Sequence, residues 1–344
     1  MKKTEISELG KFALIEQLTK SIELKNPSSS KGVGDDAAVL SYGEKQVLLS
    51  TDLLMEGIHF DLMYFPLKHL GYKAAITGFS DIYAMNGQPK QLTVSLGISQ
   101  RFSVEDIEDF YEGVYLACQE YGVDVVGGDT TASLTGLTIS VTCVGEGENG
   151  RIVYRNGAKE NDLVCVSGDL GAAYMGLQLL EREKMLFNER KEKSFQPDFS
   201  GKEYLLERQL KPEARKDVVA FLSEYNIVPT SMIDVTDGLA SELLHICKQS
   251  KTGCQIFEEH IPIDYQTAAM AEQFNMNVTT VAMNGGADYE LLFTVPLFKH
   301  EEVLKIKGVH VIGHITKEDY GCQLQMRDGA EIEITAQGWK RQEV

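Results

Sequence analysis

The feature that most constrains the fold is an alternation of two hydrophobic periods between residues 44 and 147. Four segments have the short apolar or alternating patterns of strands: EKQVLLSTDLL, QLTVSLGIS, VDVVGGD and LTISVTCVGEG. Two segments repeat with the helical period instead. One has Pro66 near its start and stops at Asn86 and Gly87, and the other follows Ser103, a residue suited to cap a helix. This half of the chain therefore mixes strands and helices.

The second half of the chain is also mixed. Strands are expected at 162–168, 231–235, 254–257, 289–295, 309–315 and 322–326, and helices at 170–183, 212–225 and 237–249. The charged stretch at 183–203 is expected to be exposed and mobile. The polar, glycine-rich EGENG at 146–150 indicates a boundary, so we predict an N-terminal domain at 1–148 and a C-terminal domain at 149–344. The predicted fold class is α+β, with two mixed α/β-layer domains rather than one doubly wound parallel sheet.

Composition argues against several kinds of protein. A formal charge of −18 over 344 residues opposes binding to nucleic acid, although a small phosphorylated ligand could enter together with cations. No apolar run reaches the roughly 18 residues of a membrane span. Glutamates at 5, 8 and 16 interrupt any signal-peptide pattern. We therefore expect no nucleic-acid or membrane partner and a cytoplasmic location.

The six cysteines are scattered along the chain, with neither a CxxC pair nor a histidine cluster at zinc-ligand spacing. They stand at positions 118, 143, 165, 247, 254 and 322. This spread predicts buried thiols in a reducing compartment rather than a structural zinc site or a disulfide framework.

Aspartates recur next to glycine or hydroxyl residues and beside apolar runs, in GVGDD, STD, FSD, GGDTT, DVTDG and NGGADYE. They are Asp35, Asp36, Asp52, Asp81, Asp129, Asp234, Asp237 and Asp288. Each alone could be an ordinary turn or helix-cap residue. Asp237 or Thr236, for example, could simply cap the helix that follows.

Asp81 does not fit that interpretation. On the predicted helix its neighbours one turn away include Thr77, Ala84 and Met85, which form a small, mostly apolar face that should pack against the protein. An unpaired carboxylate there would cost several kcal/mol, roughly, and no lysine or arginine is expected at helical spacing from it. A metal cation is the simplest partner.

Asp52 and Asp129 repeat this arrangement, because each follows an apolar strand and ligand sites often gather at strand ends. Oxygen ligands without histidine or cysteine favour Mg²⁺. Magnesium holds few carboxylates and keeps waters and substrate phosphates as its other ligands. Several acids therefore suggest more than one Mg²⁺, with nucleotide phosphates completing the shells, and we expect the adjacent Asp35 and Asp36 to await metal ions.

Common catalytic motifs are missing from the sequence. It has no GxxxxGK[ST] loop, no GxGxxG after a strand, no kinase HRD or DFG set, no GxSxG and no HExxH. If ATP binds, metal ions and glycine amides such as those of Gly127 and Gly128 must hold its phosphates.

Taken in order, GVGDDAAVL, STDLLMEGIHF, FSDIYAMNG, GGDTT, RNGAKENDLV, IDVTDGL, GGADYELLFT and a C-terminal GW resemble the thiamine-monophosphate kinase family over about residues 30–340. The wider superfamily includes aminoimidazole ribonucleotide synthetase. The resemblance implies transfer of the γ-phosphoryl group of ATP to thiamine monophosphate, giving thiamine diphosphate and ADP. It also implies a homodimer whose N-terminal domains pair through their sheets.

The resemblance further assigns site residues. Metal-binding positions of the family fall on Asp35, Ser50, Thr51, Asp52, Asp81, Asp129, Asp234 and Asp237, its nucleotide contacts on Tyr111, Gly127, Gly128, Arg155 and Thr236, and its substrate contacts on His59, Ala287 and Trp339. Two positions depart from the family pattern. Ala287 stands where the family usually has a glutamate that touches thiamine, and Thr236 stands in place of a serine and keeps its hydroxyl.

Other interpretations remain open for these residues. Without the resemblance, Trp339 could anchor the C-terminal tail, His59 and Tyr111 could pack in the core, and Arg155 could pair with Asp162 at the surface. The protein could also be another ATP-using member of the superfamily, or an acidic protein that binds divalent cations without catalysis. Because a phosphate monoester is already ionised near neutral pH, with a second pKa of about 6, no residue is assigned as a catalytic base.

Overall fold

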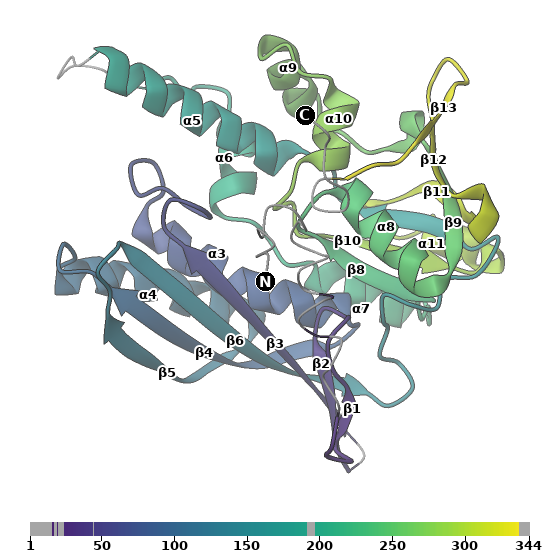
Figure 1. Cartoon of the computed structure of the whole chain (residues 1–344), viewed down its shortest axis with the longest axis horizontal. Coiled ribbons are helices and arrows are strands. Elements are labelled where there is room, and N and C mark those ends of the chain that lie inside the picture. The colour runs from purple at the N-terminus through teal and green to yellow at the C-terminus, as the bar shows by residue number, and fades with distance from the viewer. Residues whose placement is uncertain (1–15, 17–18, 20–23, 44, 191–196, 337–344) are drawn as a thin grey trace, which may run out of the picture.

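The computed structural model describes residues 24–43, 45–190 and 197–336, together with Glu16 and Thr19. In this part of the chain the strands form two sheets, one of six strands and one of seven (Figure 1). Among the strand ladders of the described residues, two pairs are parallel, β4 (Gln88–Ile98) with β5 (Asp124–Ala132) and β9 (Thr252–Phe257) with β12 (Cys322–Gln325), and the others are antiparallel. The α+β class is confirmed.

The first sheet has the order β1-β2-β3-β6-β4-β5. Its remaining strands are β1 (Ser29–Lys31), β2 (Ala38–Tyr42), β3 (Lys45–Met55) and β6 (Leu137–Glu148). One face is covered by α3 (Leu67–Ala84) and α4 (Val104–Tyr121), as Figure 1 shows. Ser103 begins α4 with a capping box, in which its hydroxyl accepts from the Asp106 amide. The strands and helices predicted for this half are confirmed.

Two glycines allow α3 and α4 to cross closely. A Cβ atom on Gly71 would lie 1.9 Å from the Phe110 carbonyl oxygen, and one on Gly113 would lie 1.8 Å from the Lys68 carbonyl oxygen. The close crossing holds α3 firmly against the sheet, and α3 is the helix that carries Asp81. Behind it, Phe79 is fully buried, and burying such a side chain contributes about 1.5–3 kcal/mol.

The other face of the first sheet is not covered by any described element. Leu49, Leu53 and Met55 of β3 point to this side and are exposed. We call this surface the open face. Nearly every residue of β5, the strand at the sheet edge, is exposed as well.

The second sheet has the order β13-β12-β9-β11-β7-β10-β8. Its remaining strands are β7 (Leu163–Ser167), β8 (Ser231–Val235), β10 (Glu290–Val295), β11 (Val309–Lys317) and β13 (Glu331–Glu333). The helices of this half are α5 (Ala172–Arg190), α6 (Glu203–Leu210), α7 (Lys216–Glu224), α8 (Leu239–Ser250), α9 (Tyr265–Gln273), α10 (Val278–Asn284) and α11 (His300–Val303), with short 3₁₀ turns at Glu258–His260, Leu297–Lys299 and Glu318–Tyr320. α8 packs its buried Leu243 and Ile246 on this sheet.

The apolar core joins the two halves. Buried residues of α3, including Phe79 and Tyr83, belong to the same cluster as Leu222 of α7 and Phe293 of β10. The first sheet ends at Glu148 and the second begins at Leu163, so the domain boundary predicted at residue 148 falls at the end of the first sheet. The division into two domains stays a prediction. Among the described residues, the structure shows no helix long and apolar enough to cross a membrane.

Two predicted segments differ from the structure. The helix predicted at 212–225 begins only at Lys216, because the Ala214 amide donates to the Tyr121 hydroxyl at 3.0 Å and is held outside a helix. The stretch 183–203, expected to be exposed and mobile, is in part helical: α5 continues to Arg190, and residues 191–196 lie outside the described part of the chain.

Candidate active site

A cleft of about 400 Å³ lies where the two halves of the molecule meet. Its walls come from β3, α3, α5 and α6 and from the segments that follow β8 and α10. The lining residues are Asp52, Leu53, Leu54, His59, Lys73, Thr77, Asp81, Tyr174, Leu177, Gln209, Asp234, Thr236, Asp237, Gly286, Ala287 and Tyr289. The cleft is therefore formed jointly by the two halves of the molecule.

Three carboxylates converge beside this cleft. One oxygen from each of Asp36, Asp81 and Asp234 lies within 4.8 Å of the other two. Asp36 precedes β2, Asp81 lies on α3 and Asp234 lies on β8. Two hydroxyls orient the group: Ser50 donates to Asp81, and Ser80 donates to Asp234 at 2.5 Å. We call Asp36, Asp81 and Asp234 the carboxylate cluster.

Burial and mutual repulsion oppose the charge of this cluster. Burial, followed by the charges of Asp52, Asp234 and Asp36, raises the pKa of Asp81 well above its usual range. Burial and then the charge of Asp36 raise the pKa of Asp234 in the same way. A divalent cation would remove this repulsion, because it satisfies several carboxylates at once.

The adjacent acids Asp35 and Asp36 have different partners. Asp36 accepts two hydrogen bonds from Arg155, from Nε and Nη2, each 2.9 Å long. Asp35 instead accepts from the Arg155 amide at 2.8 Å and pairs with Lys31 at 3.0 Å. The sequence resemblance pointed to Asp35 as the metal ligand, whereas the structure places Asp36 in the cluster.

Strand β3 presents its residues to two faces in turn. Ser50 is buried on the side of α3, where it reaches Asp81, and Asp52 lines the cleft. Thr51 points to the open face, and its hydroxyl donates to the Val141 carbonyl at 3.0 Å. The Thr51 hydroxyl therefore does not join the carboxylate cluster. The strand also continues to Met55, so Asp52 does not end it as the sequence suggested.

The Asp52 carboxylate is desolvated. Burial raises its pKa to about 6, and the charge of Asp36 adds to this against a lowering effect of Thr77. Its Oδ2 atom is buried and has no hydrogen-bond partner among the described residues. A buried, unpartnered carboxylate oxygen is costly, which indicates that a ligand completes it.

Within a single chain, Asp129 lies far from Asp52. It is exposed on the edge strand β5, pairs with Ser95 of β4, and accepts from the Thr130 amide at 2.9 Å. β5 is three strands away from β3 in the sheet. Because Asp129 is paired with Ser95, the two side chains point to the same side of the sheet, which is the open face. Gly127 and Gly128 lie on the same exposed strand. The expectation that each of these aspartates ends its strand was wrong, since β3 continues to Met55 and β5 continues to Ala132.

The remaining predicted site residues divide into two groups. His59, Thr236, Asp237 and Ala287 line the cleft. Tyr111 lies elsewhere, in a separate hollow of about 620 Å³ beside α4, where its ring contacts those of Phe110 and Tyr115. Trp339 lies outside the described residues.

The backbone around Ala287 is unusual. Ala287 and Tyr289 have φ angles of 60° and 55°, in the left-handed region that residues other than glycine rarely adopt. Their amides donate to the carbonyls of Thr236 and Val235, at 2.9 and 3.0 Å. These bonds hold the segment against the end of β8, and strained backbone of this kind is often found at functional sites.

Lys73 is the main cleft residue that the sequence analysis missed. It is 4% exposed, and its ammonium donates to the Gln209 carbonyl at 2.9 Å. Burial lowers its pKa to about 8, against the charge of Asp288. Lys73 lies two turns before Asp81 on α3, a spacing that could have revealed it.

A larger hollow of about 1090 Å³ lies against the second sheet, away from the carboxylates. Its lining includes the four histidines His260, His300, His310 and His314, the acids Asp169, Glu259 and Asp264, and apolar residues. No group of three potential metal ligands forms there among the described residues. The smaller cleft is therefore the candidate active site, because its chemistry and not its volume is distinctive.

Comparisons with known proteins define the class of this fold. The family model described as AIR synthase related protein, N-terminal domain, matches residues 34–146, which include Asp36, Asp52 and Asp81. The hydrogenase maturation protein HypE, solved in complex with ATP, shares the fold with a TM-score of 0.68 at 18% identity, over 93% of this chain and 94% of that chain. The protein thus has an AIR synthase-related fold.

Closer relatives identify the family. Thiamine-monophosphate kinase of Aquifex aeolicus is 36% identical over 335 residues, which are 97% of this chain and 99% of that relative. The enzyme of that name from Bacillus subtilis is 33% identical over 314 residues, 91% of each chain. The structure of AaThiL complexed with AMPPCP and TMP matches with a TM-score of 0.83 and 34% identity, over 99% of this chain and 100% of that one. This chain belongs to the thiamine-monophosphate kinase family.

Proposed function

We propose that this protein transfers the γ-phosphoryl group of ATP to thiamine monophosphate and releases thiamine diphosphate and ADP. The observation that carries the proposal is the carboxylate cluster at a cleft between two sheets, in a chain of this family. The 34%-identical AaThiL was solved with AMPPCP and TMP, which supports a nucleotide and a phosphorylated acceptor as ligands.

Magnesium is the cation that we propose for this cleft. The donors are carboxylate oxygens, which suit Mg²⁺ better than zinc or copper. Asp36, Asp81 and Asp234 would hold it, and the buried, unpartnered Oδ2 of Asp52 offers a further ligand. Asp237 at the cleft could bind a second ion. Bound Mg²⁺ would neutralise and orient the phosphates of the nucleotide.

The chain's own residues prepare the site for two anionic substrates. Ser50 and Ser80 fix the orientation of the carboxylates, and Arg155 fixes Asp36. Lys73 brings a buried positive charge to the cleft. The acceptor phosphate is already ionised near neutral pH, so the site needs no general base. Phosphoryl transfer depends mainly on positioning and electrostatics, which these groups supply.

The assignment of substrate contacts stays a proposal. Thr236 for the nucleotide, and His59 and Ala287 for thiamine monophosphate, are supported by their place in the cleft. Arg155 uses its Nε–H and one N–H of Nη2 to hold Asp36, which leaves the second N–H of Nη2 and both of Nη1 for a nucleotide contact. A substrate role of Trp339 rests on the family resemblance alone.

The test is a direct assay of turnover. Purified protein is mixed with ATP, MgCl₂ and thiamine monophosphate, and thiamine diphosphate is followed by chromatography. Product should form only with the monophosphate and with Mg²⁺, and not with unphosphorylated thiamine or with EDTA. If ATP binds but no thiamine diphosphate forms, the proposed acceptor is wrong. An aminoimidazole ribonucleotide precursor, tested in parallel, would then identify another activity of the class.

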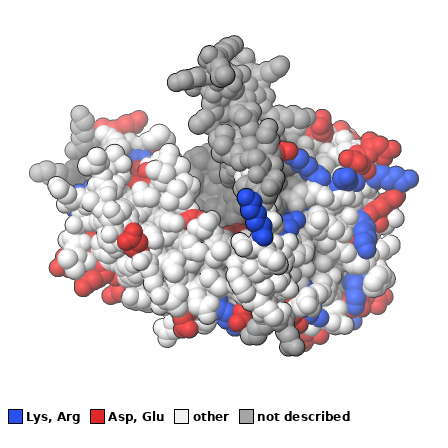
Figure 2. All heavy atoms as spheres, turned by 60° about the horizontal axis from the view of Figure 1, so that its bottom comes forward, with Lys and Arg blue, Asp and Glu red and all other residues white. Residues whose placement is uncertain are grey.

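We also propose a homodimer that forms through the open face. Exposed Leu49, Leu53 and Met55 form an apolar surface of the kind that marks protein interfaces. Figure 2, in which the bottom of Figure 1 comes forward, shows few charged side chains over the half with the first sheet. A second chain could also bring Tyr111, Gly127, Gly128 and Asp129 to a site that they do not reach alone.

Light scattering during size-exclusion chromatography tests the dimer. The wild type should show twice the chain mass of 38.2 kDa. Leu53→Glu should yield monomers, because it places a charge in the apolar surface. Phe298→Glu is the matched control, since Phe298 is exposed on the other half. A monomeric wild type, or a dimeric Leu53→Glu variant, would refute this interface.

A cytoplasmic location is the last part of the proposal. The proposed co-substrate ATP supports it, and so do the six cysteines, which are all free thiols as in proteins of a reducing compartment. Cell fractionation with an antibody to the protein checks it.

A further inference from the structure

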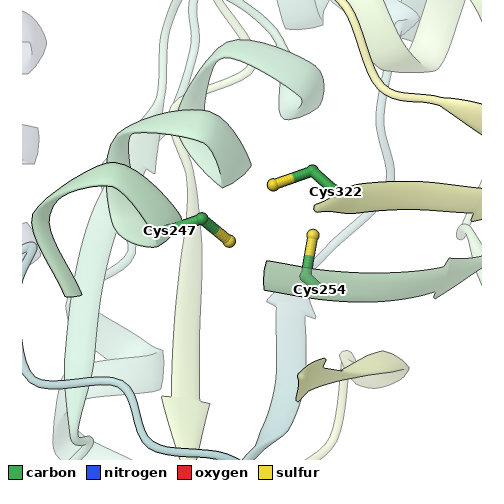
Figure 3. Close-up of side chains that lie close together, drawn as sticks. All are labelled: Cys247, Cys254 and Cys322. Carbon is green, nitrogen blue, oxygen red and sulfur yellow. The ribbon is translucent and has the colours of Figure 1, made fainter. Parts of the chain in front are cut away.

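Three cysteines meet outside the cleft, although the sequence separates them widely. Cys247 lies on α8, Cys254 on β9 and Cys322 at the start of β12. The parallel pairing of β12 with β9 places Cys322 directly beside Cys254. Figure 3 shows the three sulfur atoms pointing into the space between the helix and the two strands. All three sulfurs lie within 4.8 Å of one another. We call this group the thiol cluster.

The thiol cluster is mostly buried. Cys247 and Cys254 are 3% and 0% exposed, whereas Cys322 is partly exposed, so a small ion can reach the cluster from one side. The buried Thr252 hydroxyl lies beside Cys247 and has no hydrogen-bond partner at normal distance among the described residues.

We propose that Cys247, Cys254 and Cys322 bind one soft metal cation as thiolates. Sulfur ligands select thiophilic ions such as Cu⁺ and Zn²⁺. Metal–sulfur bonds of about 2.3 Å in a trigonal site place the sulfurs about 4.0 Å apart, so each pair would close by less than about 1 Å. Binding releases the thiol protons to water and changes no oxidation state.

The number of ligands bears on the choice of ion. Among the described residues, no histidine or carboxylate joins the three sulfurs. Three thiolates suffice for Cu⁺, whereas Zn²⁺ prefers four ligands and would add water or the Thr252 hydroxyl. A disulfide explains the arrangement less well, because it would join two sulfurs at about 2.05 Å and leave the third without a role.

A bound ion would connect three separate elements. β12 lies next to the sheet edge, and α8 begins directly after Gly238, beside the cleft residues Thr236 and Asp237. The ion would fasten this strand and this helix to β9. Because the ion would bind only the assembled cluster, the folded state should be stabilised.

Metal binding by the full-length chain is the test. Reduced protein, freed of metals, is titrated with Cu⁺ or with Zn²⁺ in competition with a chromophoric chelator, and stoichiometry is read by native mass spectrometry. One ion per chain and a higher melting temperature are expected for at least one of the two metals. Cys322→Ala should weaken binding by more than about 100-fold. Cys118→Ala, which removes a buried cysteine of α4, should bind as the wild type does.

Three results would overturn the proposal. In the first, the wild type binds neither Cu⁺ nor Zn²⁺ more tightly than Cys322→Ala does. The second is equal loss in Cys118→Ala. The third is a disulfide between two of the three cysteines, seen as a loss of two hydrogens after exposure to air, together with a reduced protein that binds neither metal. Should Cys322→Ala fail to fold, alkylation of the wild type decides: added metal must protect Cys322 from iodoacetamide, and equal labelling refutes the site.

Discussion

Arg155 holds both carboxylate oxygens of Asp36 in a bidentate pair, with two bonds of 2.9 Å. Asp36 precedes the second strand of the first sheet, and Arg155 lies in the segment between the two sheets. The Asp36 side chain is fully buried in this pair. Arg155, in the segment that connects the two halves, therefore fixes the position of the Asp36 carboxylate in the cluster.

Replacing this arginine should destabilise the protein. Arg155→Ala leaves Asp36 buried without a cation, and breaking a buried pair in this way costs about 3–5 kcal/mol. Urea unfolding without divalent cations measures the loss. Arg101→Ala is the control, because Arg101 is half exposed and its pair with Glu56 should contribute less than about 1 kcal/mol. Equal losses in the two variants would contradict the role given to Arg155.

Asp81→Asn should separate catalysis from stability. The change removes one of several carboxylates that repel one another, so the metal-free variant should be at least as stable as the wild type. Turnover should fall about 100-fold or more, and MgCl₂ with ATP should no longer raise the melting temperature. Asp319→Asn, which changes an exposed carboxylate, should behave as the wild type in both assays. Substantial turnover by Asp81→Asn would exclude Asp81 from the metal site.

Lys73 should give stability a distinctive pH dependence. Its pKa is lowered from 10.5 to about 8 in the folded protein, so between these values the unfolded chain binds more protons than the folded one. The free energy of unfolding should therefore rise with pH from about 8 to about 10. Below about pH 8 Lys73 is charged in both states, and the folded protein bears the whole cost of burying that charge. The Lys73 contribution is at most about 3 kcal/mol.

Comparison with Lys73→Met isolates this effect from the other groups that titrate in the same range. Unfolding in urea at pH 8 and pH 10, without substrates, gives the free energy of unfolding of both proteins. From pH 8 to pH 10, the free energy of unfolding of the wild type should increase relative to that of Lys73→Met. A pH-independent difference would mean that Lys73 titrates normally.

Ala287→Glu should strengthen binding of thiamine monophosphate. Ala287 lines the cleft where the family usually has a glutamate, and a carboxylate there would face the cationic ring of the substrate. An added ion pair of up to about 1 kcal/mol lowers KM for the monophosphate by roughly threefold to fivefold. KM for ATP should not change. Ala287→Gln has similar size without charge, and an equal effect of both variants would refute an electrostatic cause.

Much of the fold could be predicted from local signals in the sequence. α4 was recognised because Ser103 and its apolar face define it, and Asp81 because its helical neighbours are small and apolar. Local signals could not choose between Asp35 and Asp36. That choice depends on the turn at Gly34, which has a φ of 125°, and on where Arg155 arrives from the other half.

The features that were missed depend on pairing over long distances. Asp129 seemed equivalent to Asp52, but β5 is an edge strand and turns its aspartate to the open face. The thiol cluster exists because β12 pairs with β9 in parallel, which no spacing of cysteines along the chain reveals. Sequence patterns define elements, whereas the order of strands in a sheet decides which side chains meet.

The bond from Ser80 to Asp234 joins residues 154 positions apart. During synthesis on a ribosome, the first sheet and α3 emerge long before β8, so the nascent chain carries Asp36 and Asp81 without their third partner. A half-made chain therefore lacks the complete carboxylate cluster, and the cluster can form only once β8 has been made. Nucleotide held through this cluster would thus report that synthesis has passed β8, which ends at Val235 of the 344 residues, and assays on stalled chains could use that property.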